Sequence, residues 1–76
     1  MIYLNNFRLY SPKLDRYVNI GDRLKFGGSG TEWTLININF DKMILKNYIN
    51  RTVRDFSILY ITDPRTSNLV EINGQR

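Results

Sequence analysis

Residues 32–49, EWTLININFDKMILKNYI, have the composition of two long strands that meet at a tight reversal. Both halves are rich in β-branched and aromatic residues, which favour strands. Asp41 is a turn-forming residue between them. We therefore expect Glu32–Phe40 and Lys42–Ile49 to pair as an antiparallel hairpin.

The predicted hairpin has two different faces, because successive side chains of a strand point to opposite sides. With Phe40 and Asp41 as the loop, Ile38 pairs with Met43, and Trp33 lies opposite Tyr48. A loop with an odd number of residues would break this assignment. The expected core face holds Thr34, Ile36, Ile38, Met43, Leu45 and Ile49, and the expected water face holds Trp33, Leu35, Asn37, Asn39, Lys42, Ile44, Lys46 and Tyr48.

An exposed Trp33–Tyr48 pair with cations beside it predicts a binding surface. Bases stack on aromatic rings while Lys and Arg contact phosphates, and the same residue types dominate protein interfaces. One alternative is that the N-terminal strand or the tail covers both rings, and another is that the cations belong to an ordinary solvated strand face. The cations expected at the surface are Lys42, Lys46, Arg51 and Arg54, together with Arg23 and Lys25 from the preceding strand.

The glycine-rich segment Gly27–Gly30 precedes this hairpin. A P-loop requires a lysine and a hydroxyl residue after its last glycine, followed by a helix. Here Thr31, Glu32 and Trp33 follow and begin a strand, so we do not expect a nucleotide site. The segment is expected to be a hairpin loop, since glycine accepts a positive φ without steric cost. A mobile recognition loop is the functional alternative.

Turn signals recur about every ten residues, a spacing typical of a small all-β domain. Gly21-Asp22 and Asp63–Thr66 are two such signals, the second with proline at its second position. Ser57–Tyr60 is expected to form a 3₁₀ turn or to begin a strand. Gly74–Arg76 is expected to fray. The further strands that we expect are Ile2–Tyr10, Arg16–Ile20, Arg23–Phe26, Thr52–Phe56 and Asn68–Asn73.

The segment GDRLKFGGSGTEWTLININFDKMILKNYINRTVRDFSILYI, from Gly21 to Ile61, resembles the SH3-like small barrels. In those, a Gly-Asp strand precedes a glycine-rich loop, a long hairpin, a fourth strand, a 3₁₀ turn and a fifth strand. KOW-type nucleic-acid-binding modules are similar, as is a small bacterial family with a Gly-Gly-x-x-Met-Thr-Val loop. This chain has Trp33 where that loop has methionine, and it adds an N-terminal strand. The resemblance covers roughly Val18–Thr62 and implies a partly open barrel of five to six strands. The length of 76 residues implies one domain, residues 1–76.

The composition argues against catalysis. The 76 residues include no cysteine and no histidine, so thiolate metal sites and the commonest acid–base group are excluded. The seven carboxylates form no recognisable pair or ligand motif, and Ser29 and Ser57 have no histidine to activate them. We expect no enzyme activity, no cofactor and no metal.

The charge of the chain suggests the class of partner. A net charge of +4 favours nucleic acid or an acidic protein. Nucleic-acid binding through the hairpin's water face is the first expectation, and a small phage-type accessory protein that binds a host or partner protein is the alternative. A homo-oligomer with Trp33 between protomers is the third alternative. The absence of alanine and the nine asparagines and nine isoleucines suggest an AT-rich genome. Neither a signal peptide nor a membrane span is recognisable, so we expect a cytoplasmic protein, in the host cytoplasm if it is viral.

Overall fold

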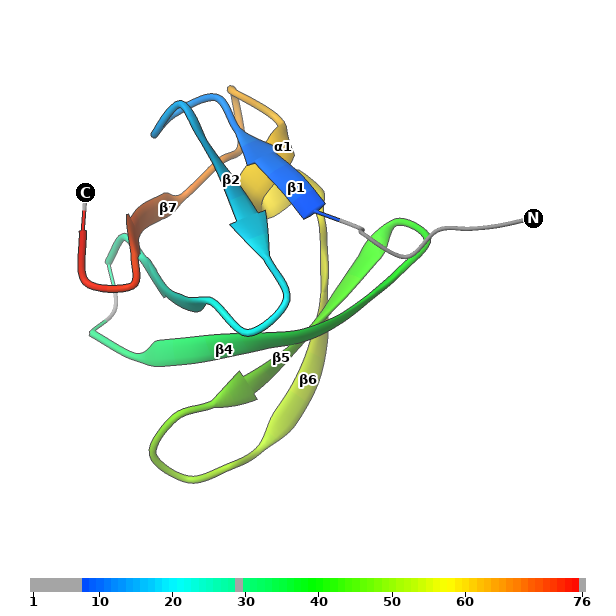
Figure 1. Ribbon diagram of the computed structural model, residues 1–76, viewed down its shortest axis with the longest axis vertical. Coiled ribbons are helices and arrows are strands. Elements are labelled where there is room, and N and C mark those ends of the chain that lie inside the picture. Colours follow the sequence, from blue (N-terminus) through cyan, green and yellow to red (C-terminus); the bar gives the residue numbers. More distant parts are fainter. Residues whose placement is uncertain (1–7, 29, 76) are drawn as a thin grey trace.

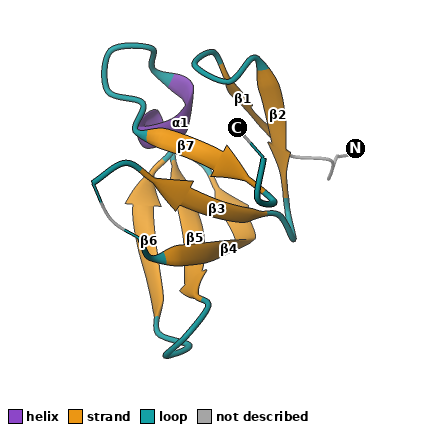
Figure 2. Ribbon diagram, turned by 90° about the vertical axis from the view of Figure 1, so that its left-hand side faces the viewer, coloured by secondary structure: helices purple, strands orange, loops and turns teal. Residues whose placement is uncertain are grey.

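The computed structural model of the protein describes residues 8–28 and 30–75 (Figures 1 and 2). The chain forms seven strands and one helical turn in this part, so the predicted all-β class is confirmed. Residues 2–7 of the first expected strand lie outside the described residues. The elements are β1 (Arg8–Ser11), β2 (Arg16–Asn19), β3 (Arg23–Phe26), β4 (Glu32–Asn39), β5 (Lys42–Asn47), β6 (Val53–Ser57), α1 (Leu59–Thr62) and β7 (Leu69–Ile72).

The strands form two antiparallel sheets. β1 pairs with β2, and the other five strands form a sheet in the order β6-β5-β4-β3-β7. In this larger sheet the chain runs as a meander from β3 to β6, passes through α1, and returns so that β7 pairs with β3. Within the described residues β6 and β7 are the two edges of the sheet, so it does not close into a barrel.

The β1–β2 hairpin lies beside α1 at one end of the molecule, while the β5–β6 hairpin extends away at the opposite end (Figures 1 and 2). Leu9 and Val18 point into the core from the small hairpin, and Ile61 enters it from α1. The larger sheet contributes the remaining apolar core residues. The buried core consists of Leu9, Val18, Leu24, Leu35, Met43, Leu45, Ile61, Leu69 and Ile72.

The outer side of the β1–β2 hairpin carries aromatic residues. Tyr10 and Tyr17 are directly opposed, with ring centroids 5.2 Å apart, and the Arg8 guanidinium lies 4.2 Å from the centre of the Tyr17 ring. The Tyr10 hydroxyl donates a hydrogen bond to the Asp15 carboxylate, and this bond raises the pKa of Tyr10. The hairpin is therefore stabilised by side-chain contacts on its solvent face as well as by the burial of its core face.

One expectation about the segment after β6 was wrong. The turn after β6 is one α-helical turn, Leu59–Thr62, in which the Thr62 amide donates to the Ile58 carbonyl at 2.9 Å. It begins after Ser57, whose hydroxyl accepts a hydrogen bond from the Leu59 amide. At the C-terminal end the Gln75 carbonyl accepts a hydrogen bond from the Ile72 amide at 2.8 Å. The expected fraying of Gly74–Arg76 stays a prediction, and Arg76 lies outside the described residues. This helix is too short to cross a membrane, and it is the one helix in residues 8–28 and 30–75.

Candidate functional site

A β-bulge in β4 changes which side chains face the core. The pairing of Asn39 with Lys42 and of Ile38 with Met43 is as expected. Between Leu35 and Asn37 the register shifts, so Ile36 has no partner of its own on β5, and Leu35 pairs with Leu45. An inserted residue reverses the alternation on one side of the bulge. Leu35 is accordingly buried and Ile36 is 39% exposed, which overturns the expected faces for the first half of β4.

Trp33 therefore lies on the inner face of the sheet, not on the water face. It pairs with Asn47 rather than Tyr48, and its other neighbour across the sheet is the buried Leu24. The indole is partly buried and packs against the hydrophobic core. The proposed stacking of a ligand between Trp33 and Tyr48 on one surface loses its geometric basis, because the two side chains are on opposite faces.

Three aromatic rings form a row on this inner face. Trp33 of β4 meets Phe56 of β6 edge to face, with ring centroids 5.5 Å apart. Phe56 in turn meets Tyr60 of α1, with centroids 6.4 Å apart. Such edge-to-face pairs contribute roughly 0.5–1.5 kcal/mol beyond the area they bury. The row is therefore held in place without a ligand.

A pocket of about 180 Å³ opens beside this row. An apolar cavity of about 150 Å³ is large enough to hold benzene, whereas pockets for drug-sized ligands measure roughly 300–1,000 Å³. The pocket thus has room for one apolar side chain and is small for a cofactor. Its lining consists of Phe26, Trp33, Met43, Leu45, Phe56, Tyr60 and Asn68.

A second hollow, of about 200 Å³, adjoins the pocket and shares Trp33 and Phe56 with it. Its lining is polar, and Arg54 is the one charged residue in the linings of the two cavities. Arg54 pairs with the buried Leu45 across the sheet, so it lies on the inner face. We call the two cavities together the aromatic groove. The residues that line the second hollow are Thr31, Trp33, Asn47, Asn50, Thr52, Arg54 and Phe56.

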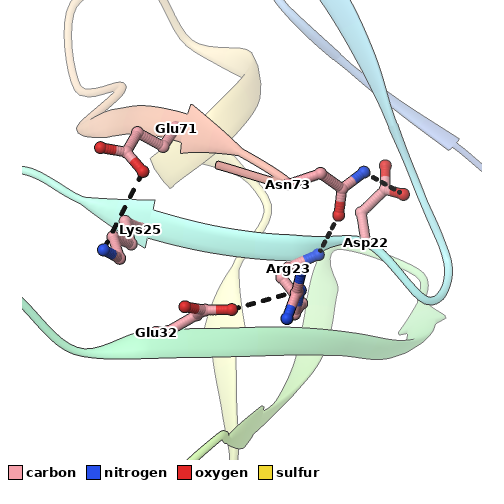
Figure 3. A network of polar contacts seen from close by, with 6 residues as sticks. All are labelled: Asp22, Arg23, Lys25, Glu32, Glu71 and Asn73. Carbon is pink, nitrogen blue, oxygen red and sulfur yellow. Dashed lines mark hydrogen bonds and ion pairs between the residues drawn. The ribbon is translucent and has the colours of Figure 1, made fainter. Parts of the chain in front are cut away.

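On the outer face of the sheet, two of the expected cations have acidic partners (Figure 3). The Arg23 Nε atom lies 3.3 Å from a Glu32 carboxylate oxygen, and the Lys25 Nζ atom lies 4.0 Å from one of Glu71. The carboxylates come from the strands on either side of β3 in the sheet. Their negative charge offsets the positive potential that the sequence predicted here.

Other expected site residues lie near this outer face. Lys46 pairs with Thr34, which in turn pairs with Arg23, so the three residues form one row across the sheet. The Arg23 guanidinium also lies 5.8 Å from the centre of the Tyr48 ring, which is 52% exposed. An open hollow is lined by Thr34, Ile36, Lys46, Asn47, Tyr48, Ile49 and Arg51.

The eight expected site residues are divided among three places. Arg23, Lys25, Lys46, Tyr48 and Arg51 gather on or beside the outer face. Trp33 and Arg54 line the groove on the inner face. Lys42 is at the far end of β5, beside the β4–β5 turn. The structure therefore separates the aromatic residue that was expected to stack from most of the cations that were expected to contact phosphate.

Sequence reasoning missed Phe26, Phe56 and Tyr60. Phe26 is on β3, whereas Phe56 and Tyr60 are on the consecutive elements β6 and α1, and only the tertiary fold brings all three to one pocket. One signal was nevertheless present in the sequence. The apolar residues stand at odd positions in Trp33 and Leu35 and at even positions in Ile36 and Ile38. The adjacent apolar pair Leu35-Ile36 is therefore where the alternation shifts by one residue, as it does at a bulge.

The described part of the chain contains no group of three or more acidic residues arranged to hold a metal ion. The Ser67 hydroxyl is buried and has no hydrogen-bond partner. Ser67 does not line either cavity of the groove. Comparison of the chain with protein-family models, with curated proteins and with solved structures found no match.

Proposed function

We propose that this chain is a non-enzymatic binding module that takes a short segment of another protein into the aromatic groove. The observation that carries the proposal is the apolar pocket of about 180 Å³ formed by Trp33, Phe56, Tyr60 and their neighbours on the inner face. Its size suits one side chain of a partner. This conclusion favours the protein-binding expectation over the nucleic-acid one.

The residue types of the groove support a protein partner. Trp, Tyr and Arg are the residues most enriched among binding hot spots, and Trp33, Tyr60 and Arg54 all line the groove. Edge-to-face packing already holds two of the rings, so little side-chain freedom is lost on binding. The partner segment should carry an apolar side chain for the pocket and a carboxylate for Arg54.

The strand order supports an SH3-like interpretation of the fold. Four consecutive strands form a meander, one helical turn follows, and the last strand returns to pair with the first strand of the meander. The β1–β2 hairpin is then an addition that covers one end of the core. In this interpretation the groove lies between the β3–β4 loop, α1 and β6.

A phage-displayed library of random twelve-residue peptides tests this function. Peptides selected on the chain should quench or shift the fluorescence of Trp33, the only tryptophan. Arg54→Glu should abolish their binding, while Lys46→Glu, an equal charge change on the outer face, should leave it intact. Thermal unfolding of both variants serves as the folding control. Selected peptides whose binding survives Arg54→Glu but is lost in Lys46→Glu would contradict the proposal.

Nucleic-acid binding remains a second candidate, supported by the row of Arg23 and Lys46 beside the exposed Tyr48. Its site would be the outer face alone. Binding of a fluorescent single-stranded oligonucleotide should then fall steeply with salt, because counterions are released. Lys46→Glu should weaken it, whereas Phe56→Ala should not. A flat salt dependence would exclude this candidate.

A further inference from the structure

Strand β6 is an open edge of the larger sheet. Within the described residues β5 is its only strand neighbour. Natural edge strands are commonly protected by proline, by a bulge, by a covering element or by charged residues, and β6 carries the last of these in Arg54 and Asp55. Val53–Ser57 contains no proline, and its pairing with β5 is continuous.

The register shows which backbone groups of β6 point away from the sheet. The Asn47 amide donates to the Thr52 carbonyl, and the Ile58 amide donates to the Asp41 carbonyl. Hydrogen-bonded and non-hydrogen-bonded pairs alternate along an antiparallel ladder. Between these two fixed points, Arg54 and Phe56 therefore bond to β5.

Val53, Asp55 and Ser57 occupy the alternate, non-hydrogen-bonded positions. Their amide and carbonyl groups point outward from the sheet edge, where a further strand could accept and donate hydrogen bonds. A strand rises about 3.3 Å per residue, so these three residues offer pairing to a partner segment of about five residues.

The side chains at this edge lead into the groove. Phe56 pairs with the buried Met43 and Arg54 with the buried Leu45, so both side chains are on the inner face. Both also line the groove. A strand added to β6 would place every second side chain on this same face, beside Phe56 and Arg54.

We propose that the partner segment binds as an added β-strand along β6, with an apolar side chain beside Phe56 and an acidic side chain two residues away beside Arg54. The inference rests on the proposed function and specifies its binding mode and ligand. Backbone pairing supplies affinity, and the two inner-face side chains supply selectivity. Arg54 provides the charge complementarity, since it is the single charged residue that lines the groove.

The probe is the synthetic peptide Ac-TLTETVT-NH₂, in which Leu and Glu are two residues apart and share a face of a strand. The control peptide Ac-TLTTEVT-NH₂ has the same composition but places them on opposite faces. Titration followed by Trp33 fluorescence should show the first peptide binding at least about tenfold more tightly, the factor that corresponds to about 1.4 kcal/mol. Equal affinities would overturn the proposed ligand pattern.

N-methylation tests the strand pairing itself. Two methylated peptides are compared, each with every second amide methylated. In one of them the methyl groups replace the donors that face β6. In the other they replace the donors that face away, so the donors toward β6 stay intact. One set should lower the affinity by about tenfold or more, and the other should have little effect. Binding should also slow hydrogen exchange at the amides of Val53, Asp55 and Ser57.

Asp55→Pro provides the matched change in the protein. Proline is tolerated at an edge position whose amide is not bonded within the sheet, and this variant leaves Arg54 and Phe56 in place. It should abolish peptide binding without unfolding the chain. Sedimentation should show a monomer both before and after the substitution. A dimer that Asp55→Pro dissociates would show that β6 pairs with a second copy of the chain, and it would refute the proposal.

The possible failures are distinguishable. If the peptide binds, and Arg54→Glu abolishes binding while both methylated sets bind equally, the groove is the site but strand addition is wrong. If neither this peptide nor any selected from the library is sensitive to Arg54→Glu, the proposed function is wrong as well.

Discussion

The bulge at Ile36 makes a quantitative prediction about two neighbouring residues. Leu35 is fully buried and opposite Leu45, whereas Ile36 is 39% exposed. Replacing a buried leucine by alanine costs about 2–5 kcal/mol of unfolding free energy, because contacts are lost and a cavity remains. For Ile36→Ala, with part of the side chain already in water, we expect about 1 kcal/mol.

These losses are large relative to the whole stability. At roughly 0.05–0.15 kcal/mol per residue, a 76-residue domain is stable by about 4–11 kcal/mol. Urea unfolding of a domain this small has a slope near 1 kcal/mol per molar. Leu35→Ala should therefore lower the midpoint by about 2 M or more, and Ile36→Ala by about 1 M.

The comparison of the two alanine variants separates burial from strand propensity, because strand propensity alone predicts the opposite order of the two losses. Isoleucine has the higher β propensity, so that effect alone would make Ile36→Ala the more costly change. Should Leu35→Ala fail to fold, Leu35→Val and Ile36→Val provide a milder pair, with expected losses of about 1 kcal/mol and a few tenths. An Ile36 variant that is as destabilised as its Leu35 counterpart would show that the inner face has been assigned wrongly.

Three further outcomes follow from the structure. Gly27→Ala should destabilise the chain by about 1 kcal/mol in a thermal melt, because the new Cβ would lie 2.9 Å from the carboxamide oxygen of Asn68. Gly30→Ala, whose Cβ would have nothing within 4 Å, should be neutral or slightly stabilising in the same melt. The hydroxyl of Tyr10 should ionise above its ordinary pKa of 10.0 in an ultraviolet pH titration, and Asp15→Asn should lower that pKa. Because folding raises the pKa of Tyr10, the stability from its hydrogen bond to Asp15 is full below pH 10 and is lost as pH rises through the folded-state pKa. Phe40→Gly should stabilise by about 1 kcal/mol in urea, because Phe40 is 94% exposed and has a φ of 58°.

Much of the fold could be predicted from local signals. Gly21-Asp22 and Asp63-Pro64 are turns in the structure, and the alternation of Arg23–Phe26 places Leu24 in the core. These predictions succeed because turn chemistry and a two-residue period act within a few residues of the chain. The pairing next to the β4–β5 turn was predicted correctly for the same reason.

The site was less accessible to sequence reasoning. Leu35 and Ile36 are both apolar, so either could fill the core, and the choice depends on the pairing of β4 with β5. Once the alternation reverses, Trp33 changes face while Lys46 stays where it was expected. The contact of Trp33 with Phe56 joins β4 to β6, two strands that are not neighbours in the sheet, and no local pattern encodes it.

The single extra residue in β4 also has a consequence for how this chain can change by insertion and deletion. Removing Ile36 would bring the strand back to simple alternation without disturbing any pair of the ladder, because the Leu35–Leu45 and Asn37–Ile44 pairs would then be consecutive. Trp33 and Leu35 would keep their places on the inner face, and β4 would lose the bend that a bulge introduces. A one-residue gap at this point should therefore be tolerated, and it would mark a protein with the same groove on a straighter strand.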